Sequence, residues 1–211
     1  MQRPTSLLTN ECLRIISLFS VSLFLSQNLY AQSDCTLRKN QDSIKVYTCN
    51  TDTSKFKSIK AEANVNTSLD KLEKFLLDFP NYKNWQFNTI ESRSLKKIAD
   101  TEFIYYTQIE APWPVNDRDM VVRFILVRSN KQLIVTANSE SNILENKKDI
   151  VRVPASRSKW TITEVSENRV SIKYEIQIDP GGNIPAWLVN WMCANAPYQS
   201  FKKLRELLEK K

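Results

Sequence analysis

The sequence predicts an α+β fold in which a curved antiparallel sheet wraps around one long C-terminal helix. Two patterns carry this prediction: apolar residues alternate with polar ones along much of residues 59–178, and apolar residues recur at helical spacing over residues 185–209. Alternation is typical of strands with one buried face, and the longer repeat is typical of a helix. Because consecutive strands and a single helix must bury their apolar sides together, we expect the sheet to curl around the helix.

The N-terminus has the features of a signal peptide. Arg3 and Arg14 flank its first region, residues 15–25 form an apolar run, and Ala31 is a small residue at a cleavage position. The run is too short to span a bilayer and has the length of a signal-peptide core. We expect cleavage after Ala31 and export of the chain; the alternative is an uncleaved N-terminal membrane anchor. Residues 35–209 are then expected to form a single domain.

The composition excludes several classes of site. Histidine is absent, which excludes Ser-His-Asp and Cys-His nucleophilic sites and histidine-based zinc sites. Two glycines in the whole chain argue against a phosphate-binding loop or a dinucleotide fingerprint. The formal charge of +7 arises from 30 basic and 23 acidic residues that are scattered along the chain, as on an ordinary solvated surface. We therefore expect a monomer with no metal, no cofactor and no nucleic-acid partner.

The first elements of the mature chain are predicted to be a β-hairpin. Residues 35–39 and 44–49 resemble two strands joined around residues 40–43, which would set Cys35 opposite Cys49. In an oxidising compartment, this pairing favours a cross-strand disulfide. The third mature cysteine, Cys193, lies on the inward face of the last helix, where a small buried residue is more expected than a reactive thiol.

After the hairpin, the spacing of the apolar residues changes from that of a strand to that of a helix, and then back to that of strands. A strand over residues 59–66 is followed by a short helix, which Thr67 and Asp70 would cap and Pro80 would end. Residues 81–85 form a polar, aromatic connection. Further strands are predicted at residues 89–98, 101–110, 119–128, 132–138, 159–165 and 170–178.

The final helix has two apolar faces. Gly181 and Gly182, side by side before Pro185, predict a hinge that leads into it. The inward face is expected to form the ceiling of the core and carries Leu188, Val189, Met192 and Cys193. The outward face is suited to a membrane interface, with burial under long loops as the alternative, and carries Trp187, Trp191, Tyr198, Lys202 and Arg205.

The segment Ala-Pro-Trp-Pro-Val-Asn-Asp-Arg-Asp at residues 111–119 resembles the most recognisable segment of START domains, the steroidogenic-acute-regulatory-related lipid-transfer family. Residues 43–47, 78–85 and 179–190 are similar to the family in order and spacing, so the resemblance covers essentially residues 35–209. It implies a helix-grip fold, in which a curved sheet holds the C-terminal helix over an apolar tunnel. It also implies a function in binding or moving one hydrophobic molecule.

Candidate ligand contacts follow from the strand that the recognisable segment opens. Many family members place an arginine in the lumen six residues beyond the match to Arg118, but Phe124 occupies that position here. Arg123 falls on the opposite face of a regular strand, so the polar anchor is missing unless a bulge shifts the register. Trp113 is a further candidate, although its turn can also be a structural corner fixed by Arg118 and Asp119. The remaining lumen candidates are Met120, Val122, Phe124, Leu126 and Tyr174.

These features favour an exported, non-enzymatic carrier or sensor of a lipid, with Gly181 and Gly182 as its gate. Sterol, phospholipid, fatty acid and isoprenoid all fit an apolar tunnel. A helix-grip enzyme such as a cyclase or hydrolase is one alternative, and it would need converging acid and base groups. A protein-interaction module with a solid core is the other alternative. The enzyme candidates are Tyr105, Tyr106, Gln108 and Tyr174.

Overall fold

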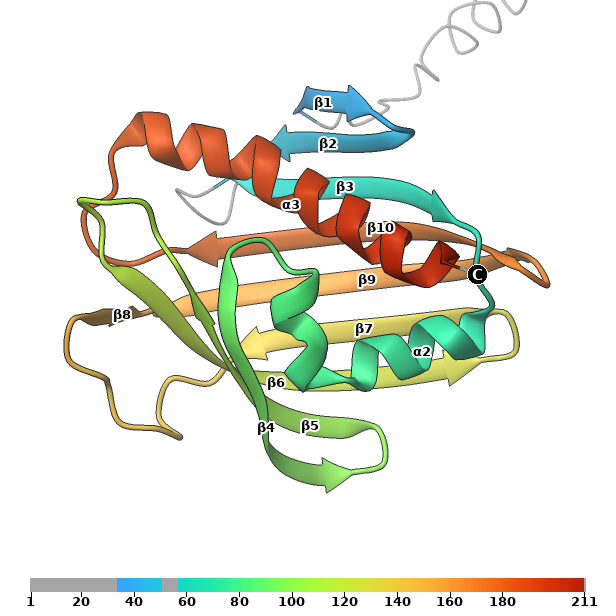
Figure 1. The fold of residues 1–211 in the computed structure, drawn as a ribbon, viewed down its shortest axis with the longest axis horizontal. Coiled ribbons are helices and arrows are strands. Elements are labelled where there is room, and N and C mark those ends of the chain that lie inside the picture. The colour runs from blue at the N-terminus through green and yellow to red at the C-terminus, as the bar shows by residue number, and fades with distance from the viewer. Residues whose placement is uncertain (1–33, 51–56, 211) are drawn as a thin grey trace, which may run out of the picture. The chain divides into compact units, whose positions relative to one another are not determined.

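A computed structural model describes residues 34–50 and 57–210 (Figure 1). The predicted signal peptide, residues 1–31, lies outside this described part. The elements are, in chain order, β1 (Cys35–Gln41), β2 (Ile44–Cys49), β3 (Ser58–Val65), α2 (Leu69–Leu77), the 3-10 helix η1 (Phe79–Asn84), β4 (Thr89–Ala99), β5 (Glu102–Ile109), β6 (Asp117–Ser129), β7 (Gln132–Ser139), β8 (Ile150–Arg152), β9 (Ala155–Ser166), β10 (Arg169–Asp179) and α3 (Ala186–Glu209).

The strands form one open sheet in the order β1-β2-β3-β10-β9-β7-β6-β5-β4. Neighbours along this path are antiparallel, and β3 pairs with β10, so the N-terminal hairpin joins the later meander at that point. Figure 1 shows α3 and α2 lying over the sheet, and both helices contribute buried residues to the same apolar core as the strands. The predicted α+β class, with a curved antiparallel sheet and a C-terminal helix, is confirmed.

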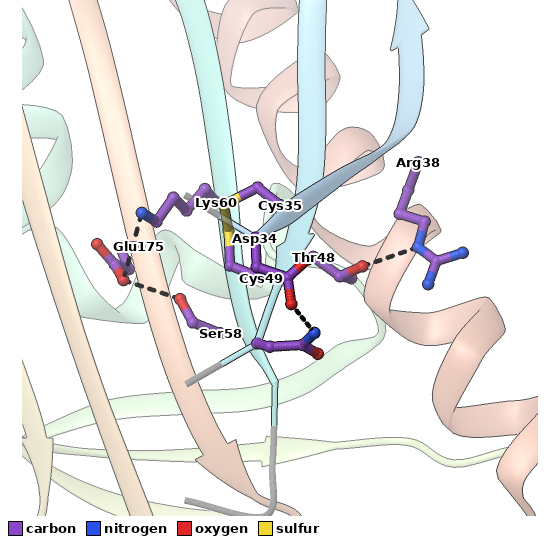
Figure 2. Close-up of a disulfide and its surroundings, with 9 residues drawn as sticks. Asp34, Cys35, Arg38, Thr48, Cys49, Ser58, Lys60 and Glu175 are labelled. Carbon is purple, nitrogen blue, oxygen red and sulfur yellow. Dashed lines mark hydrogen bonds and ion pairs between the residues drawn. A yellow bond between two sulfur atoms is a disulfide. The ribbon is translucent and has the colours of Figure 1, made fainter. Parts of the chain in front are cut away.

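The N-terminal hairpin is confirmed, with a shorter turn than predicted. Asp42 and Ser43 alone form the turn, with φ angles of 53° and 58°, as a two-residue turn matched to strand twist requires. Cys35 pairs with Cys49 in the strand register, and the two form a disulfide with a Cα–Cα distance of 3.9 Å. Figure 2 shows this disulfide between β1 and β2.

The first helix starts one residue later than predicted. Ser68, rather than Thr67, is the N-cap, and its hydroxyl accepts a hydrogen bond from the backbone N–H of Lys71 at 3.2 Å. The segment predicted as a polar connection is instead the 3-10 helix η1, with Pro80 in its first turn. The Tyr82 hydroxyl donates to the carbonyl of Leu76 at 2.6 Å, which ties η1 back to α2.

Two features of the later strands differ from the prediction. Strand β8 was not predicted, because three residues are too few to show a period; it pairs in parallel with the start of β6. Strand β9 begins at Ala155 rather than at residue 159, since its first residues continue the pairing with β10. The other predicted strands agree with the observed ones to within two residues at each end.

Helix α3 contains Pro197 near its middle. Proline has no backbone N–H to donate to the carbonyl four residues earlier, and its ring crowds that carbonyl, so a helix bends or weakens there. We refer to residues 186–196 as the first half of α3 and to residues 198–209 as the second half. In the described part of the chain, no helix is both long enough and apolar enough to cross a membrane.

Candidate functional site

A cavity of about 440 Å³ lies between the sheet and α3. Its sheet wall consists mainly of inward-facing residues of β5, β6, β9 and β10, with single residues from β1, β2, β3, β4 and β7, and its ceiling is mainly the first half of α3. The volume falls in the range of about 300–1,000 Å³ that is typical of sites for small hydrophobic ligands. The alternating side chains that line it include Met120, Val122 and Phe124 on β6 and Tyr174, Ile176 and Ile178 on β10.

Aromatic side chains close one end of the cavity. Trp160 stacks on Phe201 of α3 with ring centroids 5.3 Å apart, and its ring lies 4.6 Å from that of Tyr174. On the side of η1, the Tyr82 ring meets those of Trp85 and Tyr105 edge to face. Such pairs add about 0.5–1.5 kcal/mol each beyond their area burial. This end of the cavity is therefore a packed aromatic wall.

The two halves of α3 meet the sheet differently. In the first half, Val189, Met192, Cys193 and Ala196 are half-buried and line the cavity. In the second half, Phe201, Leu204 and Leu208 are buried in the apolar core. The first half thus covers the void, whereas the second half borders it only at Ser200 and Phe201 and otherwise packs against core side chains.

The structure brings together most of the predicted lumen residues. Met120, Val122, Phe124, Tyr174, Val189, Met192 and Cys193 all line the cavity. Leu126 and Leu188 are buried but lie outside its lining. Trp113 does not line it either: its side chain is 92% exposed, because the proline-flanked segment forms a loop between β5 and β6 that extends away from the core.

Arg123 points out of the cavity, as predicted. The pairing of β6 with β5 and β7 is regular through this residue, so no bulge turns it inward. Its guanidinium instead forms ion pairs with Glu102 and Glu140 on the outer face. Phe124 occupies the inward position and is 3% exposed.

The four polar residues that an enzyme would need do not converge. Tyr105 and Tyr174 line the cavity, whereas Tyr106 and Gln108 lie on the other face of β5, where the Tyr106 hydroxyl is 3.3 Å from Gln108 Oε1. Burial raises the pKa values of Tyr105 and Tyr174, which keeps both phenols neutral. Neutral phenols without a base partner do not constitute an acid–base pair.

Two buried polar atoms in the lining have no hydrogen-bond partner among the described residues: the indole nitrogen of Trp85 and the hydroxyl of Thr89. Both residues are at least nine-tenths buried. An indole N–H can only donate, so it lacks an acceptor in the cavity. The sequence patterns did not propose either residue as a ligand contact, because Trp85 lies in the irregular segment after η1 and Thr89 is the first residue of β4.

The glycine pair before α3 lies beside a buried charged cluster. Gly181 and Gly182 have φ angles of 65° and 61°, which L side chains rarely adopt. Arg118 donates a hydrogen bond to the carbonyl of Gly181 at 3.3 Å, and Asp119 forms a buried ion pair with Arg152 at 2.6 Å. Within the turn after Trp113, Arg118 also donates to the Asn116 carbonyl, but the carboxylate that accepts from the turn backbone is Asp117, from the Ala111 N–H, and not Asp119.

The predicted outward stripe of α3 is only partly exposed. Trp187 and Trp191 are 67% and 46% exposed. Tyr198 does not face outward for a membrane contact: it is 3% exposed, as in the alternative of burial, and its hydroxyl donates to Asp42 at 2.6 Å, because the hairpin turn packs against this side of the helix. Lys202 and Arg205 also face that turn, where Lys202 lies 4.0 Å from the Asp42 carboxylate and Arg205 donates to the Asp42 carbonyl.

Comparisons with known proteins agree with this geometry. The family model for the START domain matches residues 32–211. An uncharacterized protein of Pseudomonas aeruginosa is 26% identical over 200 residues, which cover 94% of this chain and 98% of that protein. Mouse phosphatidylcholine transfer protein is 28% identical over 105 residues, 47% of this chain; the match spans about half of that relative, 49% of its length.

A solved structure shows the same fold. The crystal structure of a STAR-related lipid transfer protein from Xanthomonas axonopodis has a TM-score of 0.76 and 30% sequence identity, and the match covers 84% of this chain and 99% of that one. The family model, the matched lengths and the common fold together leave one assignment. This chain belongs to the START domain family.

Proposed function

We propose that this protein is a non-enzymatic carrier that holds one hydrophobic molecule in the cavity under the first half of α3. The observation that carries the proposal is the cavity itself, about 440 Å³ lined mainly by apolar and aromatic side chains. Burying apolar ligand surface there contributes roughly 25 cal/mol per Å². The similarity to proteins named for lipid transfer supports the same class of ligand.

The direct test is mass spectrometry of molecules extracted from the protein purified from its own cells. We expect about one hydrophobic molecule per chain. Ala196→Phe, which fills the cavity, should lower this occupancy several-fold, whereas Ala194→Phe, on the same helix but outside the lining, should leave it unchanged. Equal occupancy in both variants, or an empty wild-type protein in repeated preparations, would contradict the carrier function.

We further propose that the carrier acts outside the cytoplasm as a monomer, after cleavage of residues 1–31. The Cys35–Cys49 disulfide supports an oxidising compartment. Cell fractionation with mass measurement of the intact chain tests this: the expected species begins at Gln32 and is found in the exported fraction. A chain that keeps residues 1–31 in the membrane fraction would favour an N-terminal anchor, and sedimentation of the purified protein checks the monomer.

The ligand is proposed to enter where Gly181 and Gly182 join β10 to α3. Arg118 holds this loop through the carbonyl of Gly181, so Arg118→Met is expected to speed ligand exchange several-fold in stopped-flow measurements. Gly181→Ala is a poor test, since a Cβ there would lie 3.0 Å from Pro154 Cδ at an unfavourable φ. Unchanged exchange in Arg118→Met would contradict the gate.

The exposed tryptophans of the first half of α3 are proposed to contact a membrane during exchange. Trp187 and Trp191 lie on the helix that covers the cavity, and tryptophan favours the headgroup level of a bilayer. Vesicle flotation of Trp187→Ala with Trp191→Ala should show reduced binding relative to wild type. The exposed Val165, on β9, offers a matched control as Val165→Ala; equal binding by all three proteins would remove the membrane contact.

A further inference from the structure

Two cations line the cavity, Arg38 and Lys57, and among the described residues no carboxylate does. Both side chains belong to exposed residues, so they lie where the cavity meets solvent. We call this pair the basic mouth. In residues 34–50 and 57–210, neither cation forms an ion pair with an acidic side chain. The charge of the mouth is therefore not neutralised by the part of the protein that the structure describes.

A β-bulge aims Arg38 at this position. The register of β1 against β2 shifts between Leu37 and Lys39, which leaves Arg38 as the extra residue. Bulges redirect a side chain that would otherwise point elsewhere. Lys39 then reaches α3, where its ammonium lies 3.0 Å from Asn195 Oδ1, and Arg38 reaches the cavity beside it.

The Arg38 side chain is held in place by a buried hydroxyl. Its Nε donates to Thr48 Oγ1 at 2.8 Å, a contact visible in Figure 2, and Thr48 is 5% exposed and also lines the cavity. Thr48 is the hydrogen-bond partner of Arg38 among the described residues, which leaves the two terminal nitrogens of the guanidinium for a ligand. An arginine oriented in this way can bind two oxygens of one anion at once.

The charges of Arg38 and Lys57 both influence one residue of α3, Cys193. Burial raises the pKa of the Cys193 thiol, and the positive charges of Arg38 and Lys57 oppose that rise. Cys193 itself lines the cavity. Both cations therefore approach the first half of α3, one from β1 and one from the residue that precedes β3.

We propose that the bound molecule is an amphipathic anion, with its hydrocarbon body in the cavity and its carboxylate or phosphate head at Arg38 and Lys57. The apolar lining accepts the body, and two cations without an acidic neighbour in the lining accept a negative head. The inference rests on the proposed carrier function and specifies its ligand class.

Four ten-carbon probes test the proposal by calorimetry at low ionic strength: decanoate, decyl phosphate, 1-decanol and decyltrimethylammonium. Delipidated wild-type protein should bind at least one of the two anions about tenfold more tightly than decanol, a typical effect of charge-assisted hydrogen bonds. Comparing decanoate with decyl phosphate identifies which head the site prefers. Salt should weaken anion binding and leave decanol binding unchanged.

Two variants remove charge while keeping an apolar side chain of similar length. The single variant is Lys57→Met, and the double variant is Arg38→Met with Lys57→Met. Lys57→Met should reduce the tenfold anion preference by about threefold, and the double variant should lose it almost entirely, about tenfold; both should bind decanol as wild type does. Lys45→Met, an exposed lysine of β2 outside the cavity, is the matched control. The single variant preserves the hydrogen bond of Arg38 to Thr48, so the test survives if the double variant folds poorly.

Two outcomes would overturn the inference while leaving the carrier function intact. One is that decanol or decyltrimethylammonium binds wild type as tightly as the anions do. The other is that the variants weaken anion and alcohol binding equally. If none of the four probes binds wild type, the carrier function itself is contradicted, because even the uncharged probe 1-decanol then does not bind in the cavity.

Discussion

The two halves of α3 belong to one continuous helix but have different roles. The second half packs Phe201, Leu204 and Leu208 into the core, and its end is tied to α2 by the Lys71 ammonium, which donates to the Leu208 carbonyl at 2.6 Å. The first half places half-buried residues over a cavity and exposes Trp187. Local stability follows buried apolar contacts, so the second half anchors the helix and the first half is the part that can open at low cost.

The N-terminal hairpin reinforces this division. Its turn residue Asp42 accepts hydrogen bonds from Tyr198 and Arg205, both in the second half of α3. Pro197 separates the halves at a point where the helical hydrogen-bond ladder is interrupted. A lid and its anchor can thus belong to one continuous helix, because proline weakens the coupling between them. The hairpin turn holds the second half through Asp42, and among the described residues the hairpin contacts the first half only near its end, through Lys39 and Asn195.

The largest expected effect is a difference in stability between matched truncations. Leu204→Ala removes a fully buried side chain from the second half and is expected to cost about 2–5 kcal/mol. Met192→Ala removes a half-buried side chain that already borders a void, so we expect less than half that cost. Denaturant unfolding followed by circular dichroism measures both, and equal costs would contradict the division of the helix.

Removing the disulfide should loosen the anchor through the hairpin. The bond closes a loop with a sequence separation of 14, for which chain entropy predicts about 3 kcal/mol. We expect Cys35→Ala with Cys49→Ala to lose about that much stability. We also expect faster amide hydrogen exchange near Tyr198 and Arg205, whose partner Asp42 lies on the hairpin. Cys193→Ala is the control; exchange that rises only in the first half would show that the hairpin holds the other end.

Sequence reasoning succeeded where a regular period extends over a whole element. Strand alternation placed Phe124 inward and Arg123 outward, and the register of the hairpin paired Cys35 with Cys49. These features depend on local geometry that repeats every two residues. The same reasoning placed most of the lumen candidates on the cavity side of their strands.

The failures occur where the repeat is interrupted. Tyr198 was assigned to an outward face by counting about 100° per residue through Pro197, and the hairpin turn that covers it is distant in the sequence. Arg38 was missed because a bulge has no signature in the alternation of β1. The cavity itself depends on unfilled volume between elements, which residue patterns do not report.

Replacing Pro197 should make the two halves of α3 open less independently of one another. Pro197→Ala restores a backbone N–H that can reach the carbonyl of Cys193, and a helix-interior proline costs up to about 3 kcal/mol relative to alanine. Pro197 also lines the cavity, so lost packing offsets part of the gain. We expect a net stabilisation of about 1–2 kcal/mol together with slower ligand exchange. Stabilisation with unchanged exchange would mean that the first half does not open as a lid.

The last prediction concerns rates rather than stability and uses Cys193 as a reporter of the first half. Thiol alkylation requires the thiolate, and burial raises the pKa of Cys193 above its ordinary value of 9.0. The rate of alkylation by iodoacetamide should therefore keep rising about tenfold per pH unit beyond pH 9, where the alkylation rate of an unfolded chain levels off.

At any one pH the alkylation rate of Cys193 should exceed the rate of global unfolding, because only the first half must open. A cysteine in the second half, Leu208→Cys with Cys193→Ala, should react no faster than global unfolding allows. Equal rates at the two positions would show that α3 opens as a single unit.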